Sequence, residues 1–146
     1  MIRCAIILGL SVYSLLLVGQ TNPWNDLSMV QKTKVYDPNY GMDIESLEAG
    51  IIALQHNNKE IELSGYIIPL TGKIEQSHFM FSRYPQNMCF FCGKAGPESA
   101  MQVFTADQKK LKFRQDKITL RGTLQINHDE ASGLLYTLQN AVLIKE

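Results

Sequence analysis

The stretch NMCFFCGKAGPES, residues 87–99, holds the side chains of this chain that are best suited to chemistry. Cys89 and Cys92 are separated by two residues, and Gly93 follows directly. In a Cys-x-x-Cys-Gly turn both thiolates can point at one ion, and the glycine supplies the positive φ angle that the tight turn requires. The spacing therefore indicates half of a metal site, a redox pair or a structural disulfide.

A metal site needs more ligands than the two cysteines. Zinc normally takes four, and one Cys-x-x-Cys motif supplies two. His78 precedes the motif in an apolar stretch, and Glu98 follows it by six residues. On the metal interpretation we expect Cys89, Cys92, His78 and Glu98 to hold a transition metal, with zinc as the first candidate.

Cu(I) is a second candidate ion, because soft sulfur ligands select it. Three methionines lie near the motif in the sequence, and each also sits where an ordinary core residue would: Met80, Met88 and Met101.

The alternative to a metal is a disulfide between Cys89 and Cys92, which an oxidising compartment favours. A catalytic redox pair is not predicted, because such pairs sit at a helix N-terminus, which lowers the thiol pKa. Here Gly93, Gly96 and Pro97 follow within five residues, so a helix is not expected to start there. Metal and disulfide both remain open.

The N-terminus predicts export. Arg3 is the only charge before Asp26, and an apolar run, residues 5–18, is followed by Gly19. This is the layout of a secretory signal peptide over residues 1–19, with a mature chain starting at Gln20 in the periplasm or cell envelope. The alternative is a retained membrane anchor, which needs roughly 20 apolar residues. Membrane contact is expected only in that case.

The charge balance argues against nucleic acid as a partner. The chain has 14 basic and 14 acidic residues. Loss of Arg3 with the signal leaves 13 basic residues and a formal charge of −1. Nucleic-acid binding depends on a basic surface, so we expect an envelope protein as the partner instead.

Five segments alternate apolar and polar residues as strands do. They are EIELSGYIIPL, SHFMFSRY, AMQVFTA, KITLRGTLQI and GLLYTLQNAVLI, residues 60–70, 77–84, 100–106, 117–126 and 133–144. The last two are expected to form a hairpin. Pro69 should end the pairing of the first.

Two of these segments share the pattern Ile-x-Leu-x-Gly-x-apolar, with Gly65 and Gly122 at the same place. Glycine inside a strand marks a bulge or a sharp bend, and a small barrel needs such curl. The pattern predicts a mainly β fold: a five-stranded OB-like barrel. An open sheet or sandwich is the alternative if the shared pattern arose by chance.

The segments before the barrel are less regular. Residues 20–42 contain two prolines and no sustained period, so we expect an extended leader. Asp43 can cap a helix, and apolar residues recur at helical spacing after it, which predicts a short helix within residues 43–58: Ile44, Leu47, Ile51 and Leu54. A single OB-like domain is expected over residues 43–146.

The region from residue 63 to residue 104 resembles a family of uncharacterised bacterial exported proteins with a predicted OB-like domain. The resemblance rests on matches at six positions in a strand and in the loop with prolines that follows: Gly65, Tyr66, Pro69, Leu70, Cys89 and Pro97. It is confined to this region of the chain. Members of the family often have one cysteine in this loop, so Cys92 is a departure. The resemblance implies a fold and an exported location, and no activity.

No phosphate-binding loop, nucleophile elbow or His-Glu-x-x-His motif occurs. We therefore expect a binding module of the cell envelope and not an enzyme. On one hypothesis the cysteine loop binds a metal. On the other the protein is a structural or protein-interaction module with a disulfide.

Overall fold

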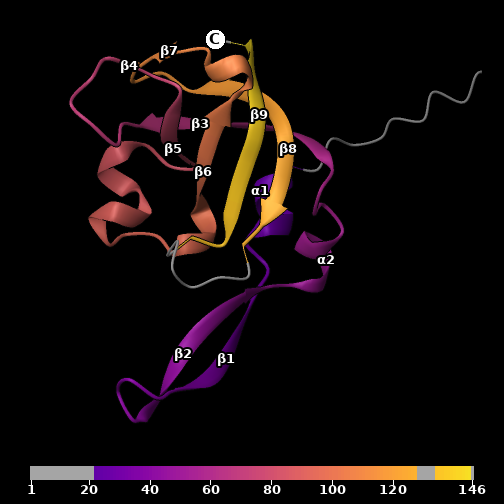
Figure 1. The fold of residues 1–146 in the computed structure, drawn as a ribbon. Helices are drawn as coiled ribbons and strands as arrows, with labels where there is room; N and C mark the ends of the chain where they lie inside the picture. Colours follow the sequence, from indigo (N-terminus) through magenta and orange to yellow (C-terminus); the bar gives the residue numbers. More distant parts are fainter. Residues whose placement is uncertain (1–21, 128–133, 146) are drawn as a thin grey trace, which may run out of the picture.

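The computed structural model describes residues 22–127 and 134–145. It is mainly β, and its centre is a closed barrel of five strands (Figure 1). The barrel strands are β3 (Glu60–Ile68), β5 (His78–Ser82), β6 (Ala100–Thr105), β8 (Ile118–Ile126) and β9 (Tyr136–Lys145). Each lies within one of the five segments predicted from alternation, apart from the last residue of β9, and β3 ends directly before Pro69.

The order around the barrel is β3-β5-β6-β9-β8, which closes back onto β3. If the five barrel strands are numbered by their order along the chain, their order around the barrel is first, second, third, fifth and fourth. β6 and β9 are parallel, and every other neighbouring pair is antiparallel. This is the arrangement of an OB-like barrel, so the predicted fold class is confirmed. The predicted pairing of the last two strands, β8 with β9, is also confirmed.

Alternate side chains of each strand fill the barrel. Ile61, Leu63 and Ile67 on β3 are buried, and so are the four apolar residues at the same spacing on β8. They join the inward side chains of β5, β6 and β9 in one core. The members with no more than 1% exposure from these three strands are Phe79, Phe81, Met101, Val103, Tyr136 and Leu138.

The two glycines lie where the strands bend. β3 pairs with β8 as far as Gly65 and with β5 from Tyr66 onward. Gly122 faces an irregularity in the β8–β9 register, where Asn140 has a left-handed φ of 52°. A side chain at either glycine would meet a backbone carbonyl of the neighbouring strand. The mid-strand glycines therefore mark the curl that the barrel needs, as expected.

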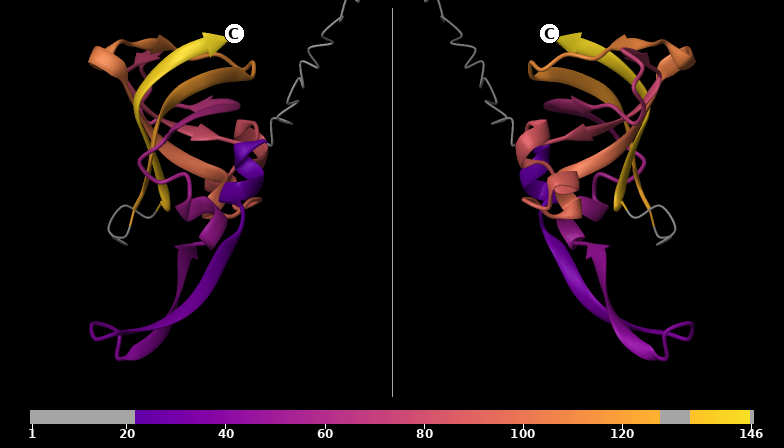
Figure 2. Two further views of the ribbon diagram at one scale, coloured as in Figure 1. Left: turned by 90° about the vertical axis from the view of Figure 1, so that its right-hand side faces the viewer. Right: turned by 90° about the vertical axis from the view of Figure 1, so that its left-hand side faces the viewer.

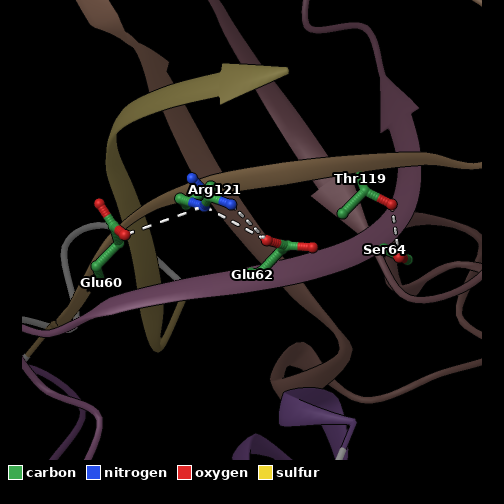
Figure 3. Close-up of polar contacts among 5 residues, drawn as sticks. All are labelled: Glu60, Glu62, Ser64, Thr119 and Arg121. Atoms are coloured by element: carbon green, nitrogen blue, oxygen red, sulfur yellow. Dashed lines mark hydrogen bonds and ion pairs between the residues drawn. The ribbon is translucent and has the colours of Figure 1, made fainter. Parts of the chain in front are cut away.

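Polar side chains cross the outer surface of the β3–β8 seam (Figure 3). Arg121 Nη2 donates to Glu62 Oε2 at 3.1 Å, and Arg121 Nε lies 4.0 Å from Glu60 Oε1. The hydroxyls of Ser64 and Thr119 are 2.8 Å apart. Such exposed ion pairs contribute little to stability, so burial of the inward residues is the main force that holds this seam.

The segment expected as an extended leader is folded from residue 22 onward. α1 (Pro23–Leu27) is capped by the side chain of Asn22, and Pro23 stands at its first turn. Trp24 and Leu27 are 1% and 0% exposed and belong to the barrel core. Trp24 Nε1 also donates to the carbonyl of Ser64 on β3 at 2.9 Å. α1 therefore acts as a plug at one end of the barrel. The predicted signal segment, residues 1–19, lies outside the described residues.

The short helix predicted from residue 43 is wrong over most of its length. β1 (Val30–Asp37) and β2 (Met42–Ala49) form an antiparallel hairpin, and within the stretch predicted as a helix only α2 (Ile51–Leu54) is helical. The helical spacing of Ile44 and Leu47 was misleading, because pairing with β1 overrides a weak local preference. The hairpin projects away from the barrel as an arm (Figure 2).

Short elements complete the described chain. β4 (Glu75–Gln76) pairs with β7 (Leu111–Lys112) as a small ribbon. The 3₁₀ turns are η1 (Gln86–Met88), η2 (Phe90–Cys92), η3 (Pro97–Ser99) and η4 (Ala106–Gln108). None of the helices among the described residues has the length and apolar character needed to cross a bilayer.

Candidate thiol site

The loop between β5 and β6, residues 83–99, carries both cysteines and three of the 3₁₀ turns. Cys89 lies between η1 and η2, and Cys92 is the last residue of η2. Gly93 follows with φ of 70°, the left-handed conformation that the sequence predicted for the turn. The amide nitrogens of Cys92 and Gly93 donate to the carbonyls of Cys89 and Phe90 and fix the turn.

The turn brings the two thiols together. Cys89 and Cys92 are 4.1 Å apart and both are free thiols. Both sulfurs donate to the same acceptor, the carbonyl oxygen of Gln86, at 3.1 Å from Cys89 Sγ and 2.8 Å from Cys92 Sγ. The turn therefore orients both thiol groups toward the same carbonyl oxygen.

The two cysteines differ in exposure. Cys89 is 1% exposed and packs in a second apolar cluster with Ile68, Met80, Ala100, Leu134 and Phe90. Because Phe79 and Phe81 point into the barrel core, Met80 between them points outward. The cysteine loop therefore covers part of the outer face of β5 and β6. Cys92, in contrast, is exposed to solvent.

The environment does not activate Cys92 as a nucleophile. Partial desolvation raises the pKa of the Cys92 thiol, and a hydrogen bond and charge interaction with Cys89 raise it further. Lys94 lowers it by a smaller amount. Catalytic thiols have lowered pKa values, whereas the pKa of Cys92 is raised.

The structure does not bring the two expected outer ligands to the thiols. His78 Nε2 lies 3.2 Å from Gln102 Oε1, and its ring stacks on Phe104 with centroids 4.2 Å apart. Glu98 lies in η3 and lines a different cavity with Lys94. Across residues 22–127 and 134–145, no three His, Cys, Asp or Glu side chains gather as a metal-binding group.

The three methionines also separate. Met80 packs in the same cluster as Cys89, Met88 is half exposed, and Met101 is fully buried inside the barrel. Of these three methionines, only Met80 therefore packs in the same cluster as Cys89, so only its thioether sulfur is a candidate soft ligand beside the two thiols.

Cys92 lines an open cavity of about 480 Å³. Two further walls come from β3 and from the segment after β7, and they include Tyr66, Phe113 and Arg114. Sequence reasoning missed Phe113 and Arg114, because they lie about twenty residues after Cys92 in a segment without regular pattern. Only the closed barrel places that segment beside the cysteine loop.

Comparison with protein-family models, with curated proteins and with solved structures gives no match, so function is inferred from the geometry of the barrel and its thiol loop.

Proposed function

We propose that this protein is a small non-enzymatic binding module of the cell envelope, in which a disulfide between Cys89 and Cys92 closes the loop over the barrel. One observation carries the proposal: both thiols converge on the carbonyl oxygen of Gln86 while the loop packs against the outer barrel face. Oxidation requires a disulfide oxidant from the compartment. The two thiols give up two protons and two electrons, and the oxidant becomes two thiols.

The covered barrel face supports a partner other than nucleic acid. OB barrels bind oligonucleotides and oligosaccharides on the face of their second and third strands. Here those strands are β5 and β6, and Cys89 and Phe90 pack over the outward Met80 and Ala100. The equal number of basic and acidic residues in the chain also argues against nucleic acid as the partner.

The projecting arm supports an envelope protein as the partner. Near its tip it exposes large apolar or aromatic side chains at 42% to 74%: Val35, Tyr36, Tyr40 and Met42. Exposed patches rich in aromatic residues and methionine are typical of protein interfaces. The resemblance to exported OB-like proteins supports the location.

A metal site is the second candidate, and the donor set favours Cu(I) over zinc. Cys89, Cys92 and the neighbouring Met80 offer sulfur ligands only. Cu(I) accepts such a soft, low-coordinate set, whereas a structural zinc ion needs two more ligands. Zinc would require those ligands from a partner chain.

Alkylation and metal analysis separate the two candidates. The protein is purified from the periplasm without reductant or chelator, alkylated after unfolding, and analysed by intact mass and elemental analysis. We expect no alkylation at Cys89 or Cys92, no stoichiometric metal, and only a small change in melting temperature on reduction, because so short a loop constrains few unfolded conformations. Two alkylated thiols and about one copper ion per chain would replace the disulfide with the metal site.

The exported location has its own test. Expression of the chain with its native N-terminus should give a mature protein that starts near Gln20, because the charge-poor apolar segment is removed. Intact mass of the periplasmic fraction measures this directly. A full-length mass confined to the membrane fraction would favour the retained anchor.

A further inference from the structure

An open groove of about 610 Å³ lies between the arm and one end of the barrel. Strand β2 and one residue of β1 form one side, and residues of α2, β8 and the segment before β9 lie across from them. Its apolar walls include six large side chains: Val35, Ile44, Leu47, Leu54, Ile126 and Leu135. The volume lies within the range of roughly 300–1,000 Å³ that is typical of ligand sites. The groove therefore offers apolar surface that a partner can cover.

One side of this groove is the free edge of a strand. The arm is a two-stranded ribbon, and no other strand of the described residues pairs with β2 (Figure 1). The amide of Gly50 donates to the carbonyl of Met29 at 2.8 Å, so this pair is hydrogen-bonded. Because hydrogen-bonded and non-hydrogen-bonded pairs alternate in an antiparallel ladder, the N–H and C=O groups of Glu45 and Leu47 point away from β1. An extended polypeptide satisfies such an edge by strand addition.

The groove is acidic. Glu45 and Glu48 line it, and no basic residue is among the described residues that do so. Lys32 Nζ lies 3.7 Å from Glu45 Oε2, but the two side chains are 71% and 67% exposed. Such exposed pairs contribute little to stability, so an incoming cation can compete with Lys32. Glu48 accepts a hydrogen bond from the Thr33 hydroxyl at 3.4 Å and keeps its charge. The groove therefore fits an apolar segment with basic side chains.

A second copy of the chain is a poor occupant of this edge. In a two-fold arrangement β2 would lie beside β2 of the other copy, and the carboxylates of Asp43, Glu45 and Glu48 would repel their counterparts. The opposite edge belongs to β1, whose Lys32 and Lys34 discourage pairing between edge strands. A basic strand from another protein meets no such repulsion at β2.

From this arrangement we propose that β2 accepts an extended basic segment of an envelope protein as an added strand in the groove. This binding mode rests on the proposed function, which supplies an envelope protein as the partner. Antiparallel addition sets the order of the added side chains. Basic residues lie opposite Glu48 and Glu45, apolar residues lie opposite Leu47 and Ile44, and a small polar residue lies opposite Ser46.

A synthetic peptide tests the added strand. The probe has the order lysine, valine, threonine, lysine, valine between blocked ends, and a control peptide has glutamate in place of both lysines. Each is titrated into isotope-labelled protein purified from the periplasm and followed by amide NMR shifts. We expect saturable binding of the lysine peptide with shifts concentrated in β2 and the groove, and at least about tenfold weaker binding of the glutamate peptide. No binding of the lysine peptide, equal binding of both, or shifts confined to other surfaces would overturn the proposal.

Two proline variants test which edge is used. Glu45 and Lys34 face each other in the register, and their N–H groups point out of the ribbon at opposite edges. Proline at either position therefore keeps the β1–β2 hydrogen bonds and removes one outward donor. Glu45→Pro should weaken binding of the lysine peptide at least about tenfold, and Glu45→Gln, which keeps the N–H, by several-fold. Lys34→Pro is the matched control and should leave binding unchanged. Equal losses from the two proline variants would exclude addition at β2. Circular dichroism checks that the variants are folded.

Methylation of the peptide backbone repeats this test without a change in the protein. The second and fourth residues of the probe lie opposite Leu47 and Glu45, so their N–H groups point at β2. N-methylation of both should abolish binding. N-methylation of the threonine, whose N–H points away from β2, should change the affinity by less than about twofold. An equal loss from the two methylated peptides would overturn strand addition.

The strand site and the proposed function can fail separately. A native protein that carries the Cys89–Cys92 disulfide but does not bind the lysine peptide would keep the proposed function and remove strand addition. A native protein with free thiols and bound copper would remove the proposed disulfide-closed module, while binding of the lysine peptide at β2 would still support the strand site.

Discussion

The hydroxyl of Tyr136 on β9 donates a hydrogen bond of 2.7 Å to the backbone carbonyl of Leu27, at the end of α1. Both residues are fully buried, and 109 positions separate them in the sequence. Together with Trp24, this bond joins the plug helix to the barrel. The segment before the arm is therefore part of the folded domain.

Removal of this hydroxyl should destabilise the protein. Tyr136→Phe keeps the ring but leaves the Leu27 carbonyl buried without this donor, which is expected to lower the free energy of unfolding by about 1–2 kcal/mol. Urea unfolding measures the change. Tyr40→Phe is the control, because Tyr40 is 74% exposed and should show no change. Equal midpoints for all three proteins would contradict the contact.

The same tyrosine predicts a loss of stability at alkaline pH. Burial raises the pKa of Tyr136, and the charge of Glu98 raises it further, whereas an unfolded tyrosine titrates near about 10. Below that pH the contribution to stability is complete. Above it the unfolded chain releases a proton that the folded chain retains, so stability falls as the pH rises. The stability difference between wild type and Tyr136→Phe should therefore shrink above about pH 10. A difference that stays constant would contradict the raised pKa.

The plug helix gives a prediction about Trp24. Trp24→Ala removes a side chain that is 1% exposed in the barrel core and also removes the donor to the Ser64 carbonyl. We expect a loss of about 3–5 kcal/mol in the free energy of unfolding. Trp24→Phe should lose less, because the ring still fills part of the space next to Phe81. If residues 22–29 were only a leader, both variants would unfold like wild type.

The mid-strand glycines give a prediction about strain. A Cβ at Gly65 would lie 2.5 Å from the Ser82 carbonyl oxygen, and one at Gly122 would lie 2.7 Å from the Gln139 carbonyl oxygen. Both oxygens belong to paired strands and cannot move freely. Gly65→Ala and Gly122→Ala should each cost more than about 1 kcal/mol. Gly72→Ala is the control, because no heavy atom outside its chain neighbours lies within 4 Å of its Cβ position. Three equal melting temperatures would contradict the close approach.

Substitutions near the tip of the arm, in contrast, should change the stability of the protein very little. Tyr36→Ser and Met42→Ser change side chains that are 62% and 59% exposed, so each should alter stability by less than about 0.5 kcal/mol. Leu47→Ala at the base of the arm should cost more, because Leu47 packs against the barrel core. Thermal unfolding of the three variants checks this. A large loss from either tip variant would show that the tip is packed within one chain.

The barrel could be predicted from the amino-acid sequence because each of its strands carries its own evidence. A strand of a small closed barrel has one face in the core, so its buried residues alternate with exposed ones, as Ile61, Leu63 and Ile67 do. Gly65 and Gly122, at matching places in two strands, indicated that these strands bend. The turn at Gly93 was also readable, because its conformation depends on the local chain alone.

The tertiary structure alone decided the rest. Trp24 lies in a segment without period, and its role depends on Ser64, which is 40 positions away. The residues of β2 show a helical spacing that only pairing with β1 overrides. The thiol site follows the same rule: the sequence placed Cys89 and Cys92 together, but the exposure of one, the burial of the other and the cavity with Arg114 depend on packing between distant segments. Local patterns encode which face of an element is buried, and long-range contacts decide what that face meets.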